Sequence, residues 1–312
     1  MPTPKVWALL SIPIIGIIFN LGRENTKILI RKIFIMALFD INRELNAFRS
    51  ISFKPMVCRY CWSSVLSPTG KYSFCQFCGA YIEGEADPEK PEDISFHNNM
   101  LKIHSSISEG SVDAAKALSS TLFTKLSDPE KLFCGGALYL FFSDNAYSNK
   151  DYALTGFMEK NSANVYESLD LISKSKEFFY KAAWLIDSTH PEERDERSEF
   201  IAFLSYIYLK QHKRAKQHLD VLNTVSKTVL QRYADMIYSV ELGTKDSAAK
   251  IETLLRENEI NSFFYLGKYL VKQRKLTEAE ALLSAITSIC KHPQAEEMLN
   301  KIRNTEQALS LQ

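Results

Sequence analysis

The pattern of hydrophobic and polar positions predicts helices through the long C-terminal part of the chain. From His97 to Gln312, apolar side chains recur three and four positions apart, as in SFFYLGKYLVKQ (262–273), which is the period of an amphipathic helix. The period-two alternation of half-buried strands is almost missing there, and the 312 residues include only 11 Gly and 10 Pro. So few turn residues disfavour an all-β protein. A mainly α fold is therefore expected.

Short segments of similar sequence recur at nearly regular intervals within this helical part, namely AKQHLDVL (215–222), AAKIETLL (248–255) and AEALLSAI (279–286). Their spacing resembles that of the tetratricopeptide repeat (TPR), which implies an α-solenoid of TPR-like helix pairs with a groove that binds a peptide or partner helix. The resemblance is clearest over 175–308, and small residues at 267 and 279 should let paired helices approach closely. It rests on Phe263, Leu266, Gly267, Leu270, Ala279, Leu283, Ile286 and Pro293 in the last unit, and on Ala215, Leu219, Leu222, Phe179, Ala182 and Pro191 in earlier ones.

Four cysteines lie in two Cys-x2-Cys pairs, Cys58 with Cys61 and Cys75 with Cys78, and the segment 62–74 separates the pairs. Each pair makes a short turn that aims two sulfurs at one point, so two pairs together can surround one tetrahedral ion. Four sulfur ligands leave no open position, which predicts a structural Zn²⁺ and not a catalytic one. Iron takes the same four ligands, and a pair of disulfides is the other use for four cysteines.

Residues 57–82 resemble the zinc-ribbon family, in which two such turns on short antiparallel strands hold a structural zinc. The resemblance makes Cys58, Cys61, Cys75 and Cys78 the ligands, and Gly79 directly after the last one suits a left-handed turn. Aromatic residues between the cysteines would form a small core or an exposed contact surface, and with Arg59 and Lys71 they would allow stacking on nucleic acid. These aromatic residues are Tyr60, Trp62, Tyr72, Phe74, Phe77 and Tyr81.

The N-terminus contains a long stretch without a charged side chain, Val6–Gly22. As a helix it would span roughly 25 Å, at the short end of what crosses a bilayer. Basic residues follow it and predict, by the positive-inside rule, a single-pass anchor with the N-terminus outside and all later domains cytoplasmic. A buried core helix and a cleaved signal peptide are the alternatives, although the latter lacks a basic start and a cleavage site. The basic flank is Arg23, Lys27, Arg31 and Lys32.

A second apolar run, residues 28–39, contains two of those basic residues, so it predicts an interfacial or docking helix that continues to about Phe48. The formal net charge is only +1, which disfavours a protein devoted to binding nucleic acid. The charge is unevenly distributed, because residues 1–82 carry ten basic and three acidic side chains whereas 83–96 carry six acidic ones. The predicted domains are an anchor with its juxtamembrane helix (1–50), a zinc ribbon (51–84), an acidic linker (85–96) and TPR-like repeats (97–312).

No catalytic motif is present in the sequence, neither a phosphate-binding glycine loop nor a Gly-x-Ser-x-Gly elbow. His97 and His104 share a helix face without evident chemistry. The segment PEERDERSE (191–199) is predicted to be a solvated helix start, and residues 145–164 a long loop between helices. Cys134 and Cys290 lie in apolar stretches and are expected to be buried free thiols. The remaining histidines, expected to be solvated, are His190, His212, His218 and His292.

These parts together predict a non-enzymatic, membrane-anchored scaffold that binds or assembles partner proteins through its cytoplasmic TPR-like domain. The combination resembles the membrane-anchored adaptors of bacterial lipopolysaccharide assembly, in which the metal module follows the repeats instead of preceding them. One alternative is a soluble nucleic-acid-associated zinc-ribbon protein. Another is a subunit of a large complex whose apolar N-terminus packs against its partner subunits.

Overall fold

The computed structural model describes residues 40–68, 73–82, 93–124, 126–148, 159–225, 229–256, 260–290 and 292–310. The predicted anchor, its basic flank, the apolar run 28–39 and most of the acidic linker lie outside these residues. Within them, no helix combines the length and the apolar character needed to span a bilayer. The chain divides into two compact units, Met1–Ala47 and Phe48–Gln312.

The described part of the first unit contains the beginning of helix α3 (Ile41–Ser50). Asp40 starts this helix, because its Oδ1 accepts hydrogen bonds from the backbone amides of Asn42 (3.1 Å) and Arg43 (3.3 Å). A carboxylate at this position satisfies amides that have no partner within the helix. The helix predicted to continue to about Phe48 is thus present from Ile41 onward.

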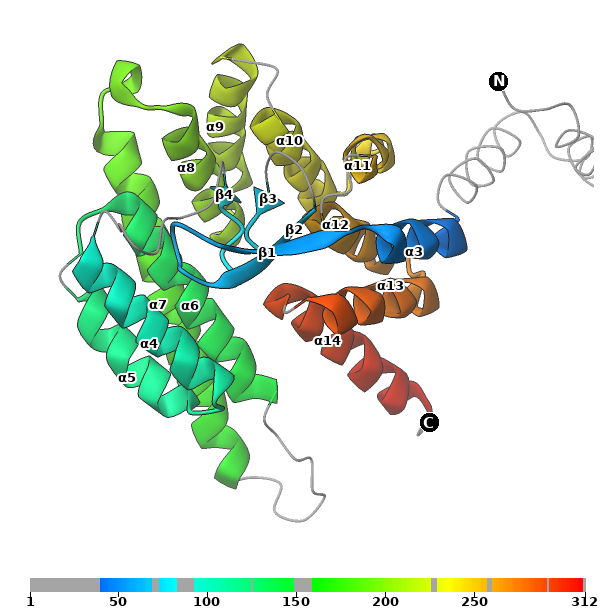
Figure 1. Cartoon of the computed structure of the whole chain (residues 1–312), viewed down its shortest axis with the longest axis horizontal. Coiled ribbons are helices and arrows are strands. Elements are labelled where there is room, and N and C mark those ends of the chain that lie inside the picture. Colours follow the sequence, from blue (N-terminus) through cyan, green and yellow to red (C-terminus); the bar gives the residue numbers. More distant parts are fainter. Residues whose placement is uncertain are drawn as a thin grey trace, which may run out of the picture. The chain divides into compact units, whose positions relative to one another are not determined.

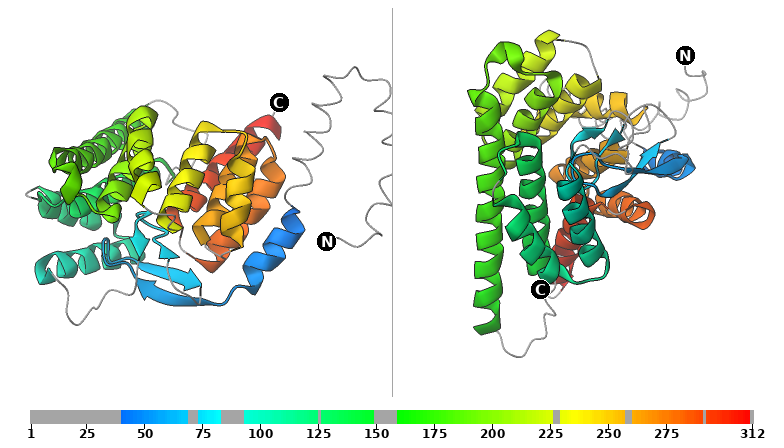
Figure 2. Two further views of the ribbon diagram at one scale, coloured as in Figure 1. Left: turned by 90° about the horizontal axis from the view of Figure 1, so that it is seen from above. Right: turned by 60° about the vertical axis from the view of Figure 1, so that its left-hand side comes forward.

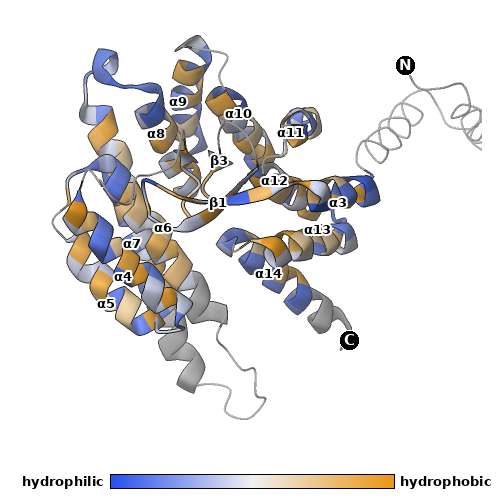
Figure 3. Ribbon diagram, in the orientation of Figure 1, coloured by the Kyte–Doolittle hydropathy of each residue, from blue (hydrophilic) through white to orange (hydrophobic). Residues whose placement is uncertain are grey.

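Within the second unit, most described residues are helical, and the helices curve around a small pair of β-hairpins (Figures 1 and 2). Consecutive helices pack as pairs, and α14 also contacts α6. Hydrophobic and hydrophilic residues alternate along these helices (Figure 3), and the buried residues are mainly apolar. The helices are α4 (Ile94–Ser108), α5 (Val112–Phe123), α6 (Pro129–Ser148), α7 (Glu159–Ser188), α8 (Glu196–Tyr208), α9 (His212–Val225), α10 (Val229–Leu242), α11 (Ser247–Leu255), α12 (Ile260–Lys272), α13 (Leu276–Ile289) and α14 (Pro293–Ser310), with a short 3-10 helix at Pro191–Glu193.

The same turn joins the two helices in four of these described pairs. Gly110, Lys210, Gly243 and Arg274 all have φ between 58° and 78°. In each turn the amide of the next residue donates to the carbonyl five positions earlier, at 2.8 to 3.0 Å, which is the Schellman arrangement that ends a helix. A left-handed backbone costs a residue with a side chain about 1–2 kcal/mol, so two of the four turns are strained and two use glycine.

A buried alanine lies five positions after the left-handed residue of each of these turns. Ala215, Ala248 and Ala279 are the first residues of the three similar octapeptides, and Ala115 holds the same place in α5. The structure therefore extends the repeat register to the pair α4 and α5, whereas the sequence alone does not fix a register for residues 112–143. The predicted close approach of the last pair is confirmed, because a Cβ on Gly267 would lie 2.9 Å from Leu283 Cδ2.

Two antiparallel hairpins form the small β part. Strand β1 (Phe53–Val57) pairs with β2 (Ser64–Pro68), and β3 (Ser73–Phe74) pairs with β4 (Tyr81–Ile82). The buried side chain of Gln76 connects the hairpins: its Oε1 accepts from the amide of Leu66 at 2.8 Å, and its Nε2 donates to the Leu66 carbonyl at 3.0 Å. Strands this short need such links, since an isolated two-stranded hairpin is barely stable in water.

The aromatic side chains of the hairpins pack against the helices. Phe74 stacks on Tyr233 of α10 with ring centroids 3.5 Å apart, Trp62 meets His97 of α4 edge-on at 4.0 Å, and Phe77 lies 5.4 Å from Phe141 of α6. Tyr60, Trp62 and Phe74 are only 6, 8 and 0% exposed. The expectation of an exposed aromatic surface is therefore wrong for these three, because the helices supply the apolar surface that a ribbon this small lacks.

Candidate metal centre

The two Cys-x2-Cys segments adopt the same backbone turn, which we call a knuckle: knuckle one is 58–63 and knuckle two is 75–80. The amide of Cys58 donates to Ser63 O (3.0 Å), as that of Cys75 does to Ala80 O (2.9 Å). The residue after the second cysteine is left-handed in both, Trp62 at φ 56° and Gly79 at φ 78°. The left-handed turn predicted at Gly79 is thus confirmed, and its counterpart is a tryptophan whose ring packs on His97.

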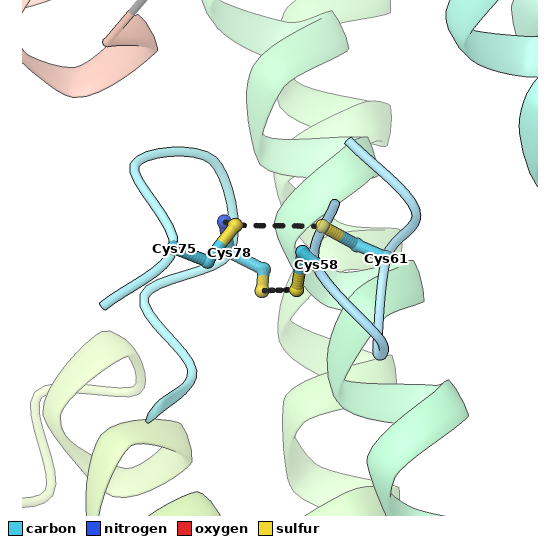
Figure 4. A group of neighbouring side chains, drawn as sticks. All are labelled: Cys58, Cys61, Cys75 and Cys78. Carbon is cyan, nitrogen blue, oxygen red and sulfur yellow. Dashed lines mark hydrogen bonds between the residues drawn. The ribbon is translucent and has the colours of Figure 1, made fainter. Parts of the chain in front are cut away.

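The knuckles bring four sulfurs together in the protein interior (Figure 4). The Sγ atoms all lie within 4.8 Å of one another, and all four side chains are 0% exposed. Two of the Sγ–Sγ distances between the knuckles are 3.9 Å, from Cys58 to Cys78, and 3.5 Å, from Cys61 to Cys75. A zinc–sulfur bond of about 2.3 Å gives a tetrahedron whose edges are about 3.8 Å. The four sulfurs thus have the spacing that a tetrahedral ion requires.

The four cysteine side chains are buried free thiols whose environments differ. All four cysteines are free, and even the shorter of the two separations, 3.5 Å, far exceeds a disulfide bond of about 2.05 Å; the disulfide alternative is therefore wrong. Burial raises the pKa of Cys58 and Cys78 well above that of an ordinary thiol. Burial also opposes ionisation of Cys61, but hydrogen bonds from the other three cysteines outweigh it and hold its pKa well below the usual value. A metal ion that binds all four sulfurs displaces their protons and balances the charge of the buried thiolates that result.

The donor set therefore fits a structural metal ion. Four sulfurs close the coordination sphere, so no position is left for a water molecule or substrate. Zinc and iron both accept this set. All four cysteines predicted as ligands are brought together, and no other group of metal-binding side chains with this geometry occurs among the described residues.

Side chains from distant helices contact the backbone of both knuckles. His104 Nε2 lies 2.6 Å from Cys61 O, so the histidine face of α4 predicted from the sequence is directed at knuckle one. Asn261 Nδ2 lies 3.5 Å from Cys75 O, and its Oδ1 accepts from His292 Nε2 at 2.9 Å. Burial lowers the pKa of His292 to about 3, so this histidine stays neutral. Sequence reasoning missed Asn261 and His292, because nothing local marks residues so far from the cysteines.

The two remaining cysteines are buried and free, as predicted. Cys134 of α6 lies close enough to Cys78 for the two thiols to affect each other's pKa, and burial raises the pKa of Cys134 to about 11. Cys290 bonds instead to the backbone, with its Sγ donating to Ile286 O at 3.4 Å. Nothing in the sequence indicated that Cys134 lies beside the metal centre, since α4 and α5 separate it from Cys78 along the chain.

A second buried polar cluster joins α7, α8 and α9. His218 Nδ1 lies 2.6 Å from Glu199 Oε2, and its Nε2 lies 3.2 Å from Asp187 Oδ1. The expectation of solvated histidines is therefore wrong for His218 and His292, which are 5 and 3% exposed. The segment 191–199 does start a helix, with Asp195 capping α8, but Glu199 at its end is buried. Arg194 and Tyr206 complete the cluster, contacting Glu199 and Asp187 respectively.

This cluster predicts a dependence of stability on pH. Burial opposes the charge on His218, but the two carboxylates outweigh burial and raise its pKa above the ordinary histidine value. Because the pKa of His218 is higher in the folded protein than in the unfolded chain, the stabilisation by this cluster is fully present at pH values below the unfolded-state pKa. It is lost as the pH rises through the folded-state pKa. The free energy of unfolding, measured in urea, should fall as pH rises from about 6.5, the unfolded histidine value, to about 9; below about 6.5 the low pKa of His292 has the opposite effect on stability. His218→Gln should flatten the curve, whereas His190→Gln, at an exposed site, should leave it unchanged; equal slopes in all three proteins would contradict the prediction.

Comparison with known proteins adds no relative to this picture. No protein-family model matches the chain, and no curated protein and no solved structure matches it either. The resemblance to lipopolysaccharide-assembly adaptors therefore stays a prediction. What the chain does have is a set of helical repeats and, among them, a four-cysteine cluster with the geometry of a metal site.

Proposed function

We propose that this protein is a non-enzymatic, membrane-anchored scaffold. In this proposal a structural Zn²⁺, bound by Cys58, Cys61, Cys75 and Cys78, fixes a zinc ribbon inside an array of TPR-like helix pairs, and the array binds partner proteins. The observation that carries the proposal is the closed set of four buried sulfurs, whose knuckles are contacted by α4 and by α12. A metal in that position maintains the shape of a binding domain and does no chemistry on a substrate.

The position of the ribbon affects where partners bind. Its aromatic residues contact α4, α6, α8 and α10, so the chain's own knuckles cover the helix faces directed toward them. Partner proteins then use helix faces directed away from the ribbon. The same packing weakens the nucleic-acid alternative, because Tyr60, Trp62 and Phe74 are buried and offer no platform on which bases stack.

The membrane anchor in this proposal rests on the sequence of residues 6–22 and on the basic side chains that follow, which place the N-terminus outside and the helical repeats in the cytoplasm. Fractionation of cells that express the full chain tests it. The protein is expected in the membrane fraction, resistant to carbonate and high salt and released by detergent. The matched variant Ile14→Arg/Ile17→Arg should lose this behaviour, because each central arginine costs about 2.5–3.5 kcal/mol of insertion free energy.

Release of the wild-type chain by carbonate alone would reject the anchor. A protein that is insoluble alone and soluble with its co-expressed partners would instead support a subunit packed within a complex. The protein can then be purified in mild detergent, and identification of the co-purifying chains reveals the partners of the scaffold.

A further inference from the structure

One hydroxyl group touches a sulfur of each knuckle. Ser63 Oγ lies 3.1 Å from Cys61 Sγ and 3.4 Å from Cys75 Sγ, while the two sulfurs are 3.5 Å apart. The side chain is 5% exposed, so little water competes for these contacts. Ser63 is thus placed between one ligand of knuckle one and one ligand of knuckle two.

The two knuckles differ at this position. Ala80 in knuckle two corresponds to Ser63 in knuckle one. In each knuckle, the backbone carbonyl of this residue accepts a hydrogen bond from the amide of the first cysteine, which lies five residues earlier. Ala80 is fully buried and forms its turn without a hydroxyl. The knuckle backbone therefore does not require serine, and an alanine at position 63 is compatible with the turn.

The hydroxyl contributes to the charge balance of a filled site. A divalent ion with four thiolates carries a net charge of −2 in the interior, where an uncompensated charge is costly. A hydroxyl that donates to a thiolate stabilises the negative sulfur, and groups in this outer layer typically change metal affinity by about 10- to 100-fold. Ser63 makes this contact with ligands from both halves of the site.

We propose that Ser63 is a positioning residue of the metal centre, whose single Oγ–H hydrogen is shared between the Cys61 and Cys75 thiolates in a bifurcated hydrogen bond and so aligns the two knuckles on one ion. This inference rests on the proposed four-cysteine metal site and adds a residue that the ligand pattern does not contain. Serine is the donor, and each thiolate that it faces is the acceptor. The effect expected from its loss is weaker metal binding without a change of fold.

The test uses Co²⁺ as a spectroscopic probe in the full chain, purified in mild detergent and reduced. Titration of wild type, Ser63→Ala, Ser63→Thr and the neighbouring exposed control Ser64→Ala compares dissociation constants. Ser63→Ala should raise the constant at least about 10-fold, and should move the sulfur-to-cobalt charge-transfer band to longer wavelength because a thiolate without its donor gives up an electron more easily. Ser63→Thr restores a hydroxyl and should recover both properties, and Ser64→Ala should match wild type.

Three outcomes would overturn this assignment. A constant for Ser63→Ala within about twofold of wild type, with the band unmoved, removes Ser63 from the metal centre. If Ser63→Thr behaves like the alanine variant, the hydroxyl is not the active group. If the wild-type protein itself shows no tetrahedral cobalt spectrum, both the proposed metal site and the role of Ser63 are rejected. The first two outcomes reject only the role of Ser63, so the two cases are distinguishable. Circular dichroism of each variant reports whether its helices are intact.

Discussion

Replacing Cys58 by serine should remove the metal and unfold much of the domain. Structural zinc contributes an apparent binding free energy of about 10–16 kcal/mol in small zinc modules, whereas a whole domain is stable by only about 5–15 kcal/mol. Because the sulfurs lie among α4, α6 and α12 and not in a separate module, the loss should reach the helices. We expect metal content to fall from about one ion to less than about half an ion per chain, with a large drop in the unfolding temperature.

A matched control for this experiment lies in the same chain. Cys290→Ser also removes a buried thiol, but its hydroxyl can still donate to the backbone as the thiol does, so it should retain both metal and stability. Removal of metal from wild type with a strong chelator should reproduce the Cys58→Ser result. A Cys58→Ser protein that keeps a full complement of metal, or an equally stable metal-free wild type, would contradict the structural role.

Phe74→Ala should produce the second-largest effect. Phe74 is 0% exposed and stacks on Tyr233 while also lying 5.9 Å from the ring of Phe200, so truncation leaves a cavity between knuckle two and helices α8 and α10. Such a change costs about 3–5 kcal/mol in a well-packed core. Urea unfolding of the metal-loaded protein, followed by helical circular dichroism, measures the loss directly.

Tyr180→Ala provides the comparison for Phe74→Ala. Tyr180 is an aromatic residue of α7 that is 46% exposed, so its removal should change stability by no more than about 0.5 kcal/mol. If Phe74→Ala costs as little as Tyr180→Ala, the hairpins do not pack on the helices as described. The pair of variants thus tests whether the ribbon is part of the same core as the repeats.

Local patterns in the sequence were enough to predict the four-cysteine cluster and the helix pairs. The Cys-x2-Cys spacing is a short-range signal, and it identified Cys58, Cys61, Cys75 and Cys78. The spacing of small residues in helices identified the close contact at Gly267. Both patterns involve residues that are close together along the chain, so they can be recognised in a single sequence.

Features that depend on distant residues were missed. Lys210 and Arg274 adopt left-handed turns although neither residue type favours them, so two of the four repeat boundaries carry no local signal. His218 was expected to be solvated because its partners Asp187 and Glu199 come from other helices. The burial of Trp62 and Phe74 follows from packing between elements, which neither composition nor spacing describes.

The bond between Asn261 and Cys75 connects residues 186 positions apart, and this separation sets an order of events during synthesis. A ribosome adds about 5–20 residues per second, so knuckle two is made roughly 10–40 s before the α12 side chain that contacts it. Contacts this distant in sequence also slow folding, since a long loop must close before they form. During that interval knuckle two lacks its contact with α12, so the packing around Cys75 is completed only when the last helices are made.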